Sequence, residues 1–153
     1  MSIPKKTIKI FVSSPSDVAD ERMVAKRVIN TLASQYAYYA NIEPVLSEKE
    51  ALPALETPQS NIPEPSSTDI FIVLLWSRLG TPIQDPRYRE HPDGPAMTGT
   101  EWEFFNAATS FTKSRRPFLL AYRKHAKVFI DRDDDAEIER GREQRRKIGR
   151  AHV

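Results

Sequence analysis

The sequence has 153 residues, of which 39% are hydrophobic and 29% charged, with 12 Pro, 5 Gly and no Cys. This composition predicts a single globular domain, and the lack of cysteine excludes disulfide scaffolds, thiolate zinc sites and cysteine nucleophiles. The longest apolar run, residues 70–76, is much shorter than the ~20 residues of a membrane-spanning helix. No signal-peptide pattern opens the chain, so we expect a soluble, cytoplasmic protein that does not bind membranes. A formal net charge of +2 favours neither nucleic acid nor membrane as a partner.

The first predicted elements are a strand over residues 7–12 and a helix that follows a short turn. The strand is rich in β-branched and aromatic residues and ends at the turn 13–17. In that turn Ser14 suits the N-cap of the helix, Pro15 its first position, and Asp17 the positive end of its dipole. Apolar residues then recur at spacings of three and four, which predicts a stripe that packs on a sheet: Ala25, Val28, Ile29, Leu32, Tyr36 and Tyr39.

The middle of the chain alternates between strands and helices. Residues 41–46 indicate a second strand, and Pro44 places it at a sheet edge because proline cannot donate to the ladder. Short helical pieces are expected between 47 and 67. Apart from Asp69, residues 69–76 and 117–122 are apolar, which predicts strands covered on both faces, with a helix over about 101–109 between them. The fold class is therefore α/β, with a central parallel sheet flanked by helices in three layers.

Two polar regions complete the pattern. The connection 80–99 carries four prolines and several charges, and a connection of this length is typical of a binding loop or lid. Residues 131–150 are mostly charged, with acids mostly first and bases mostly last. This order predicts a solvated helix that complements its own dipole, with Glu143 and Lys147 as an i,i+4 pair.

The last six residues, 148–153, match one reading frame of a widely used sequencing adapter. We therefore expect a non-native tail there, and a single domain over residues 1–147 that is the N-terminal fragment of a longer protein. The alternative is a genuine charged C-terminus.

Three segments should meet at one edge of the sheet. In an open parallel sheet, ligands bind outside the carboxyl ends of the strands, where helix N-termini also present free N–H groups. The segments are residues 13–17, residues 76–81 and residues 98–103, which open the helix after the long loop. Together they offer hydroxyl groups, an arginine, two tryptophans and three carboxylates, Asp17, Glu101 and Glu103.

These segments carry a resemblance to a known family. "KIFVSSPSDVADER", "TDIFIVLLWSRLGTP", "TGTEWEFFNA" and "PFLLAYRK", in this order, resemble a TIR-like domain family of unknown function. In that family the domain lies N-terminal to a STAND or NACHT-type ATPase module, often followed by WD repeats. The resemblance spans about residues 9–147. It implies a flavodoxin-like, TIR-like sandwich, a role in bacterial signal transduction or antiphage defence, self-association on activation, and C-terminal ATPase and sensor modules as partners.

The resemblance also implies that Glu103 is the catalytic residue. TIR domains that cleave NAD carry their catalytic glutamate in a pattern similar to residues 103–107, and nucleoside deoxyribosyltransferases carry a Gly-Thr-x-x-Glu pattern similar to residues 99–103. True TIR enzymes usually show a Trp-Cys pair further before the glutamate, whereas here Trp102 is adjacent to it. Breaking a ribosyl N-glycosidic bond develops positive charge on the sugar, which a fixed carboxylate stabilises. NAD is then a substrate, and no cofactor is expected.

The predicted site therefore has Glu103 as the catalytic residue and a set of substrate-binding residues from the three segments. Either tryptophan would stack on a flat base, and the serines and the arginine would hold diphosphate or ribose oxygens. The substrate-binding residues are Ser13, Ser14, Trp76, Ser77, Arg78, Gly99, Thr100 and Trp102.

Structural roles compete with each assignment. Thr100 and Glu103 also fit a capping box, the serines fit turn and cap positions, and both tryptophans fit core packing. Arg78 would equally pair with a loop carboxylate such as Asp85, and Asp69 fits a structural role before its strand.

Three functions remain open from the sequence. The first is an effector or signalling domain that cleaves NAD at the nicotinamide–ribose bond, the second a non-catalytic self-association or adaptor domain, and the third a nucleoside or nucleotide ribosyl-transfer enzyme. The three histidines share no spacing that suggests a metal site or a triad, no P-loop motif occurs, and acids neighbour the basic cluster near the last strand. Neither a metal nor nucleic acid is therefore expected.

Overall fold

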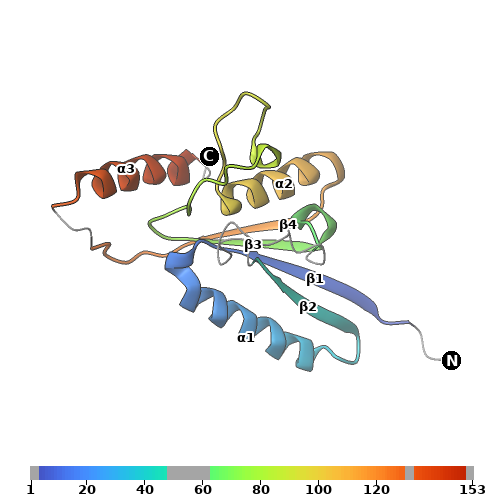
Figure 1. Ribbon diagram of the computed structural model, residues 1–153. Helices are drawn as coiled ribbons and strands as arrows, with labels where there is room; N and C mark the ends of the chain where they lie inside the picture. The colour runs from blue at the N-terminus through green and yellow to red at the C-terminus, as the bar shows by residue number, and fades with distance from the viewer. Residues whose placement is uncertain (1–3, 48–62, 130–132, 151–153) are drawn as a thin grey trace.

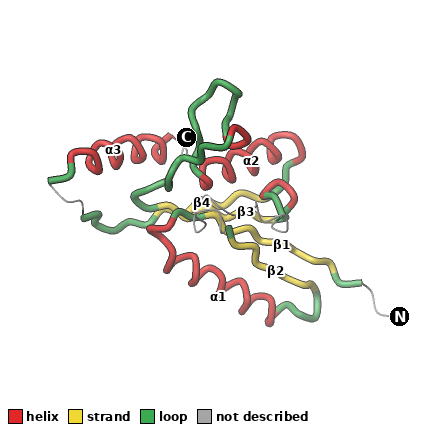
Figure 2. The backbone as a smooth tube through the Cα atoms, viewed as in Figure 1, coloured by secondary structure: helices red, strands yellow, loops and turns green. Residues whose placement is uncertain are grey.

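The computed structural model describes residues 4–47, 63–129 and 133–150, which form a four-stranded parallel sheet with helices on both faces (Figures 1 and 2). The strands are β1 (Lys6–Ser13), β2 (Ala40–Leu46), β3 (Ile70–Leu75) and β4 (Phe118–Arg123), in the order β2-β1-β3-β4. The helices are α1 (Ala19–Gln35), α2 (Gly99–Ser114) and α3 (Asp135–Arg150), with short 3-10 turns at Ser16–Val18, Pro65–Ser67 and Pro86–Tyr88. The predicted α/β class with a flavodoxin-like sandwich is confirmed.

The strand order explains where a ligand would bind. The chain leaves β1 to form β2 on one side and later returns to form β3 on the other side of β1. The connections therefore diverge between β1 and β3, and their carboxyl ends form the switch point at which open α/β sheets bind ligands. In Figure 1 this rim is the end of the sheet from which α1 begins.

The core has two parts, one on each face of the sheet. On the α2 face, Phe11 of β1 stacks on Phe71 of β3, and α2 contributes Ala107. On the α1 face, Ile10 and Val12 pack against Ile29 of α1. Burying these side chains is the main stabilising contribution, at about 1.5–3 kcal/mol for each large apolar side chain.

The first predicted helix begins later than its cap signals indicate. A 3-10 turn occupies Ser16–Val18 and α1 starts at Ala19, so neither Ser14 nor Pro15 has its predicted place in α1. Of the predicted stripe, Ile29 is buried and Ala25 and Leu32 are half-buried, whereas Val28 and Tyr36 are exposed. Only the middle of the stripe therefore rests on the sheet.

The strand predictions are right in position but differ in burial. β2 is an edge strand, as Pro44 predicts. β3 buries Phe71, Val73 and Leu75 on the α2 face and leaves its other face half-buried. β4 is the opposite edge, and all of its residues except Leu119 are exposed, so the prediction that it is covered on both faces is wrong.

The predicted helices after β3 are also longer or shifted. α2 starts two residues before the predicted range and runs to Ser114, and α3 starts at Asp135. Lys147 of α3 pairs with Glu101 of α2, at 3.2 Å, in place of the predicted partner Glu143. Most of the helical pieces expected between 47 and 67, and residues 151–153 of the expected tail, lie outside the described residues. Ile148, in the expected tail, is buried and packs on the α2-face core.

Within the part of the chain that the structure describes, no helix combines the length and apolar character that crossing a bilayer requires.

Candidate functional site

Glu103 lies in the second turn of α2 with its side chain turned into the protein, and only 1% of the residue is exposed. Ser13 Oγ, at the end of β1, donates a hydrogen bond to Glu103 Oε2 at 2.6 Å. Ser47 Oγ, directly after β2, donates to Glu103 Oε1. These two hydroxyls offset part of the cost of burying a carboxylate. One acidic side chain of α2 is thereby tied to the carboxyl ends of β1 and β2.

The capping role expected as the alternative for Glu103 belongs to another residue. Thr98 is the N-cap of α2: its side chain accepts from the Glu101 amide at 3.2 Å, and the Glu101 carboxylate accepts from the Thr98 amide at 2.8 Å. The capping box is therefore two residues earlier than the Thr100–Glu103 pair, and that interpretation is wrong. Because the helix is capped without it, Glu103 is available for another role.

The turns after β1 and β3 are joined by Asp17. Its Oδ2 atom accepts hydrogen bonds from the Ser77 amide at 3.0 Å, the Ser77 hydroxyl at 2.9 Å and the Arg78 amide at 3.0 Å. The sequence interpretation assigned Asp17 to the dipole of the first helix, and the structure corrects this. Asp17 fixes the two turns that flank the switch point.

Two buried polar atoms at this rim have no hydrogen-bond partner within the described residues. They are Ser14 Oγ and Asp17 Oδ1. Ser14 is only 2% exposed, and its carbonyl oxygen accepts from Arg22 at 3.5 Å. Buried polar atoms are nearly always paired with protein or water, so atoms of this kind mark a place for a bound polar group or an ordered water.

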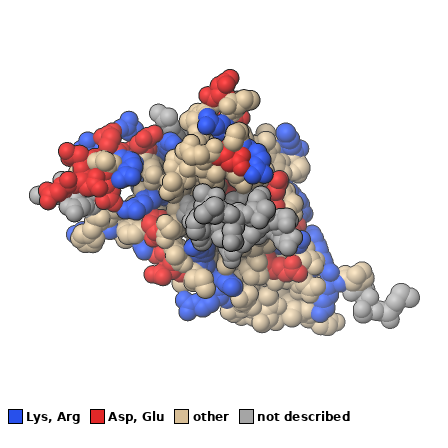
Figure 3. All heavy atoms as spheres, in the orientation of Figure 1, with Lys and Arg blue, Asp and Glu red and all other residues tan. Residues whose placement is uncertain are grey.

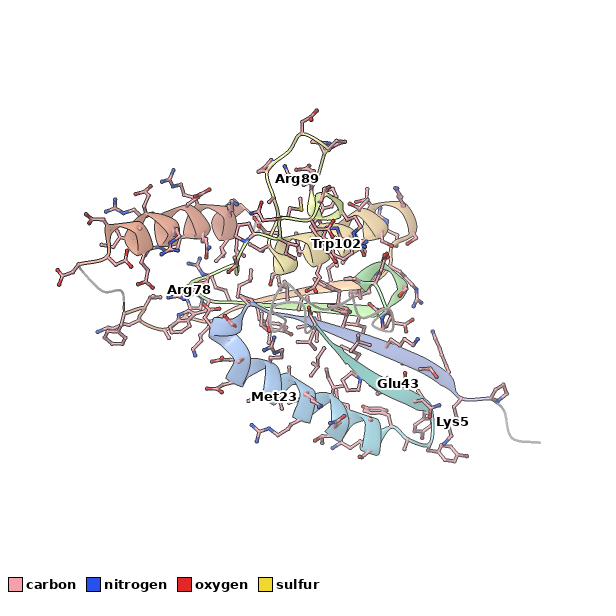
Figure 4. All side chains as sticks on the ribbon, viewed as in Figure 1. Lys5, Met23, Glu43, Arg78, Arg89 and Trp102 are labelled. Carbon is pink, nitrogen blue, oxygen red and sulfur yellow. The ribbon has the colours of Figure 1, made fainter. Side chains whose placement is uncertain are left out.

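Arg78 and the tryptophans make contacts away from Glu103. Arg78 binds Glu137 of α3 at 2.5 Å, and Asp85, its expected partner, instead pairs with Arg87, whose hydrogen bonds lower the pKa of Asp85. Figure 4 shows Arg78 at the end of the sheet near α3. Trp76 Nε1 donates to the Ala126 carbonyl at 3.2 Å.

The second tryptophan belongs to the packing of the long loop on α2. The Trp102 ring meets the Tyr88 ring edge-on, with 5.2 Å between ring centroids. Figure 4 shows Trp102 on α2, below the loop that carries Arg89. A surface groove beside Trp102 is lined by Ser66, Phe105, Asn106, Thr109, Ser110 and Lys113.

A second, apolar pocket lies between the sheet, α2 and α3. Its walls come from β3, the loop after it, α2, β4 and α3, and include Thr100 and the Glu101–Lys147 ion pair. Gly99 and Thr100 are buried at the start of α2. Of the predicted site residues, Thr100 therefore lines this pocket.

The structure thus brings five of the predicted residues together in two sets at the rim of the sheet. Ser13 and Glu103 are bonded, and Ser77 and Arg78 are bonded to the turn that contains Ser14. Trp76 and Trp102 have their described contacts elsewhere. Sequence reasoning missed Ser47 and the role of Asp17. The only signal for Ser47 was its position directly after a strand, which it shares with Ser13 and Ser77.

Two further observations bear on function. Among the described residues, no group of three or more His, Asp or Glu side chains is placed to hold a metal ion. No family model matches the chain, and no curated protein or solved structure is significantly similar to it.

Proposed function

We propose that the protein is a TIR-like effector or signalling domain that cleaves the nicotinamide–ribose bond of NAD, with Glu103 as the catalytic carboxylate. The observation that carries the proposal is the position of Glu103. It is a buried acid at the carboxyl ends of β1 and β2, beside the switch point, held by two serine hydroxyls while Glu101 caps the helix. The STAND-type ATPase and sensor partners and the self-association on activation are part of the same proposal and rest on the sequence resemblance. The cytoplasmic location is also part of the proposal and rests on the lack of a signal-peptide pattern.

The chemistry requires one well-placed negative charge. As the bond to nicotinamide breaks, its electron pair leaves with the neutral nicotinamide and positive charge develops on the ribose. A carboxylate beside the ribose stabilises that charge. Water then adds to the ribose carbon that held nicotinamide and loses a proton to solvent, which gives ADP-ribose. Ser13 and Ser47 fix the carboxylate in one orientation, which reduces the reorganisation needed in the transition state.

Access to the carboxylate sets a condition on this mechanism. Because the residue is 1% exposed, the ribose must take the place of at least one serine hydroxyl at Glu103. A ribose hydroxyl that donates to the carboxylate oxygen left by that serine preserves the hydrogen bonding of Glu103. We therefore expect substrate binding to move the segment that carries Ser47 or Ser13.

The same burial favours a second candidate, the non-catalytic adaptor. In this function the hydrogen bonds of Glu103 hold α2 against the ends of β1 and β2. The domain then acts by self-association and catalyses no reaction. In that role its two hydrogen bonds contribute to stability, at about 1.5–3 kcal/mol each for bonds to a charged group.

One assay distinguishes the NAD-cleaving function from the adaptor function. It measures nicotinamide release by the full-length protein and by its Glu103→Gln variant. Glutamine keeps the shape and one acceptor but removes the charge. The proposal predicts at least a hundredfold loss of release from a variant that still folds, on the scale of one lost transition-state contact. Glu43→Gln, on the exposed part of β2, is the matched control and should retain full release. Equal release by the Glu103→Gln variant removes Glu103 from the mechanism. No release by either protein supports the adaptor, in which the two hydrogen bonds to Glu103 serve stability alone.

A further inference from the structure

The sheet has two edge strands, β2 and β4, and β2 is protected against the addition of another strand. The Ser47 amide, directly after β2, donates to the Val12 carbonyl of β1. By alternation, the even-numbered residues of β2 direct their backbone groups away from β1, and Pro44 is one of them. Because proline has no N–H to donate, it interrupts this outward row. Proline on an edge strand is one of the ways in which natural proteins prevent edge-to-edge pairing.

β4 has no such interruption. The Phe118 amide donates to the Asp69 carbonyl, and the amide of Lys124, directly after β4, donates to the Leu75 carbonyl. The even-numbered residues of β4 therefore face β3, and the odd-numbered residues direct both N–H and C=O to the open side. Within the part of the chain that the structure describes, these outward groups have no hydrogen-bond partner. They belong to Leu119, Ala121 and Arg123.

The side chains of β4 leave the edge open as well. All of its residues except Leu119 are exposed, and three of the exposed side chains are large and apolar: Phe118, Leu120 and Tyr122. Residues 118–122 include neither a proline nor a charged residue. An exposed apolar edge strand with free backbone groups is a template for pairing with another chain.

The sequence of β4 is complementary to itself in the antiparallel direction. With Ala121 on a two-fold axis, Ala121 faces its own counterpart and Leu119 faces Arg123 of the second copy. These are the residues with outward backbone groups, so each pair exchanges both N–H···O bonds. Leu120 then faces Tyr122 in the closer, non-hydrogen-bonded pairs, and a pair of an apolar and an aromatic side chain stabilises a sheet.

The charges at the two ends of β4 favour this position of the axis. With the axis at Ala121, Lys124 faces Phe118, and no charged residue of the paired strands faces a like charge. Moving the axis to Leu120 would place Arg116 opposite Lys124, and like charges directly opposite each other destabilise a sheet.

We propose that β4 pairs with β4 of a second copy, antiparallel and centred on Ala121, so that the two four-stranded sheets join into one. Because Pro44 interrupts the other edge, assembly stops at a two-fold dimer and does not continue into fibres. The dimer gives a surface to the self-association proposed above. It rests on the backbone groups of β4 and is independent of NAD cleavage.

Sedimentation and amide hydrogen exchange test the proposal on the 153-residue protein. Sedimentation should show a monomer–dimer equilibrium that shifts towards the dimer as the concentration rises. In the dimer, amides of Leu119, Ala121 and Arg123 should exchange at least about tenfold more slowly, whereas those of Leu120 and Tyr122, which face β3, should change little. A protein that is still monomeric at about 1 mM, or a dimer without this alternation, overturns the proposal.

Paired charge substitutions locate the interface. The double variants Leu120→Lys/Tyr122→Lys and Leu120→Glu/Tyr122→Glu each place like charges opposite each other, so each alone should be monomeric. An equal mixture of the two should form a heterodimer, because every Lys then faces a Glu. The matched control, Tyr38→Glu/Tyr39→Glu, lies at exposed positions in the turn before β2 and should dimerise as the unaltered protein does.

Two outcomes of the mixing experiment contradict the proposed interface. Dimerisation of either double variant alone would place the interface elsewhere, and so would the lack of a heterodimer between two folded variants. None of these readouts involves NAD or Glu103, so their failure would leave the proposed NAD cleavage to its own test.

Discussion

At the scale of single residues, Asp17 has the most concentrated set of contacts at the rim. One oxygen accepts three hydrogen bonds from Ser77 and Arg78. Replacing Asp17 by Ala leaves two backbone amides without their acceptor, and we expect the free energy of unfolding to fall by about 2–3 kcal/mol. Asp17→Asn retains one carbonyl oxygen and should lose less. Urea denaturation measures both, with exposed Asp20→Ala as the control. A loss no larger than that of the control would show that the turns are fixed by other contacts.

The ion pair between Glu21 and Lys124 gives a pH-dependent contribution to stability. The hydrogen bond from Lys124 lowers the pKa of the Glu21 carboxyl below its ordinary value of 4.5. A carboxyl with a lowered pKa in the folded state stabilises the protein above pH 4.5, and this contribution is lost as the pH falls through the folded-state pKa. About a third of each side chain is exposed, so we expect less than about 1 kcal/mol.

Glu21→Gln tests this contribution. The variant should be slightly less stable than the unaltered protein at pH 7, and the difference should shrink as the pH falls below 4.5 and through the lowered pKa of Glu21. Chemical denaturation at a series of pH values measures it, and Lys124→Met should remove the same pH-dependent difference. A stability difference that stays the same at every pH would point to packing rather than charge.

At the scale of elements, the start of α2 determines how Glu103 is presented. Thr98 caps the helix through its side chain and the Glu101 carboxylate completes the box. Thr98→Ala should lower the free energy of unfolding by about 1 kcal/mol, whereas Thr98→Ser keeps the hydroxyl and should cost little. Thermal and urea unfolding measure the difference. If the alanine and serine variants are equally stable, the cap does not contribute to the stability of α2.

The sequence predicts elements better than it predicts what covers them. The alternation of strands and helices was sufficient for the parallel sheet, and Pro44 for the edge position of β2. The apolar run at 117–122 could not show that β4 is mostly exposed, because hydrophobicity records a preference for burial and not the presence of a neighbour. Likewise, Thr98 and Thr100 both precede a glutamate by three residues, and only the backbone shows which pair is the cap.

The candidate site was predictable in position but not in its contacts. The rule that ligands bind at the carboxyl ends of parallel strands identified the segments containing Ser13, Ser77 and Glu103. It could not identify the bond from Ser47 to Glu103, because that bond depends on a register between β1 and β2 that places Val12 opposite Leu46. It also could not show that Trp76 donates to Ala126, a contact across 50 residues of sequence.

At the scale of the whole molecule, α3 joins the rim mainly through side chains. Gln144 accepts from the Leu79 amide at 2.8 Å, and Glu137 binds Arg78 from the turn after β3. Figure 3 shows acidic side chains gathered on α3 at the left of the molecule. β1 and β3, by contrast, are central strands with hydrogen-bonded neighbours on both sides. We therefore expect α3 to open locally while the sheet stays closed.

Amide hydrogen exchange tests this difference in local stability. Amides of β1 and β3 should exchange only through global unfolding, and those of α3 at least about a hundredfold faster through local opening. Gln144→Ala removes the bond to the Leu79 amide and should speed exchange in α3 and in the turn after β3, with no change in α1 or β2. Since that turn also holds Ser77 and Arg78 against Asp17, a change confined to α3 would mean that the Asp17 contacts alone keep the rim closed. Uniform acceleration throughout the chain would instead show that α3 and the sheet unfold as one cooperative unit.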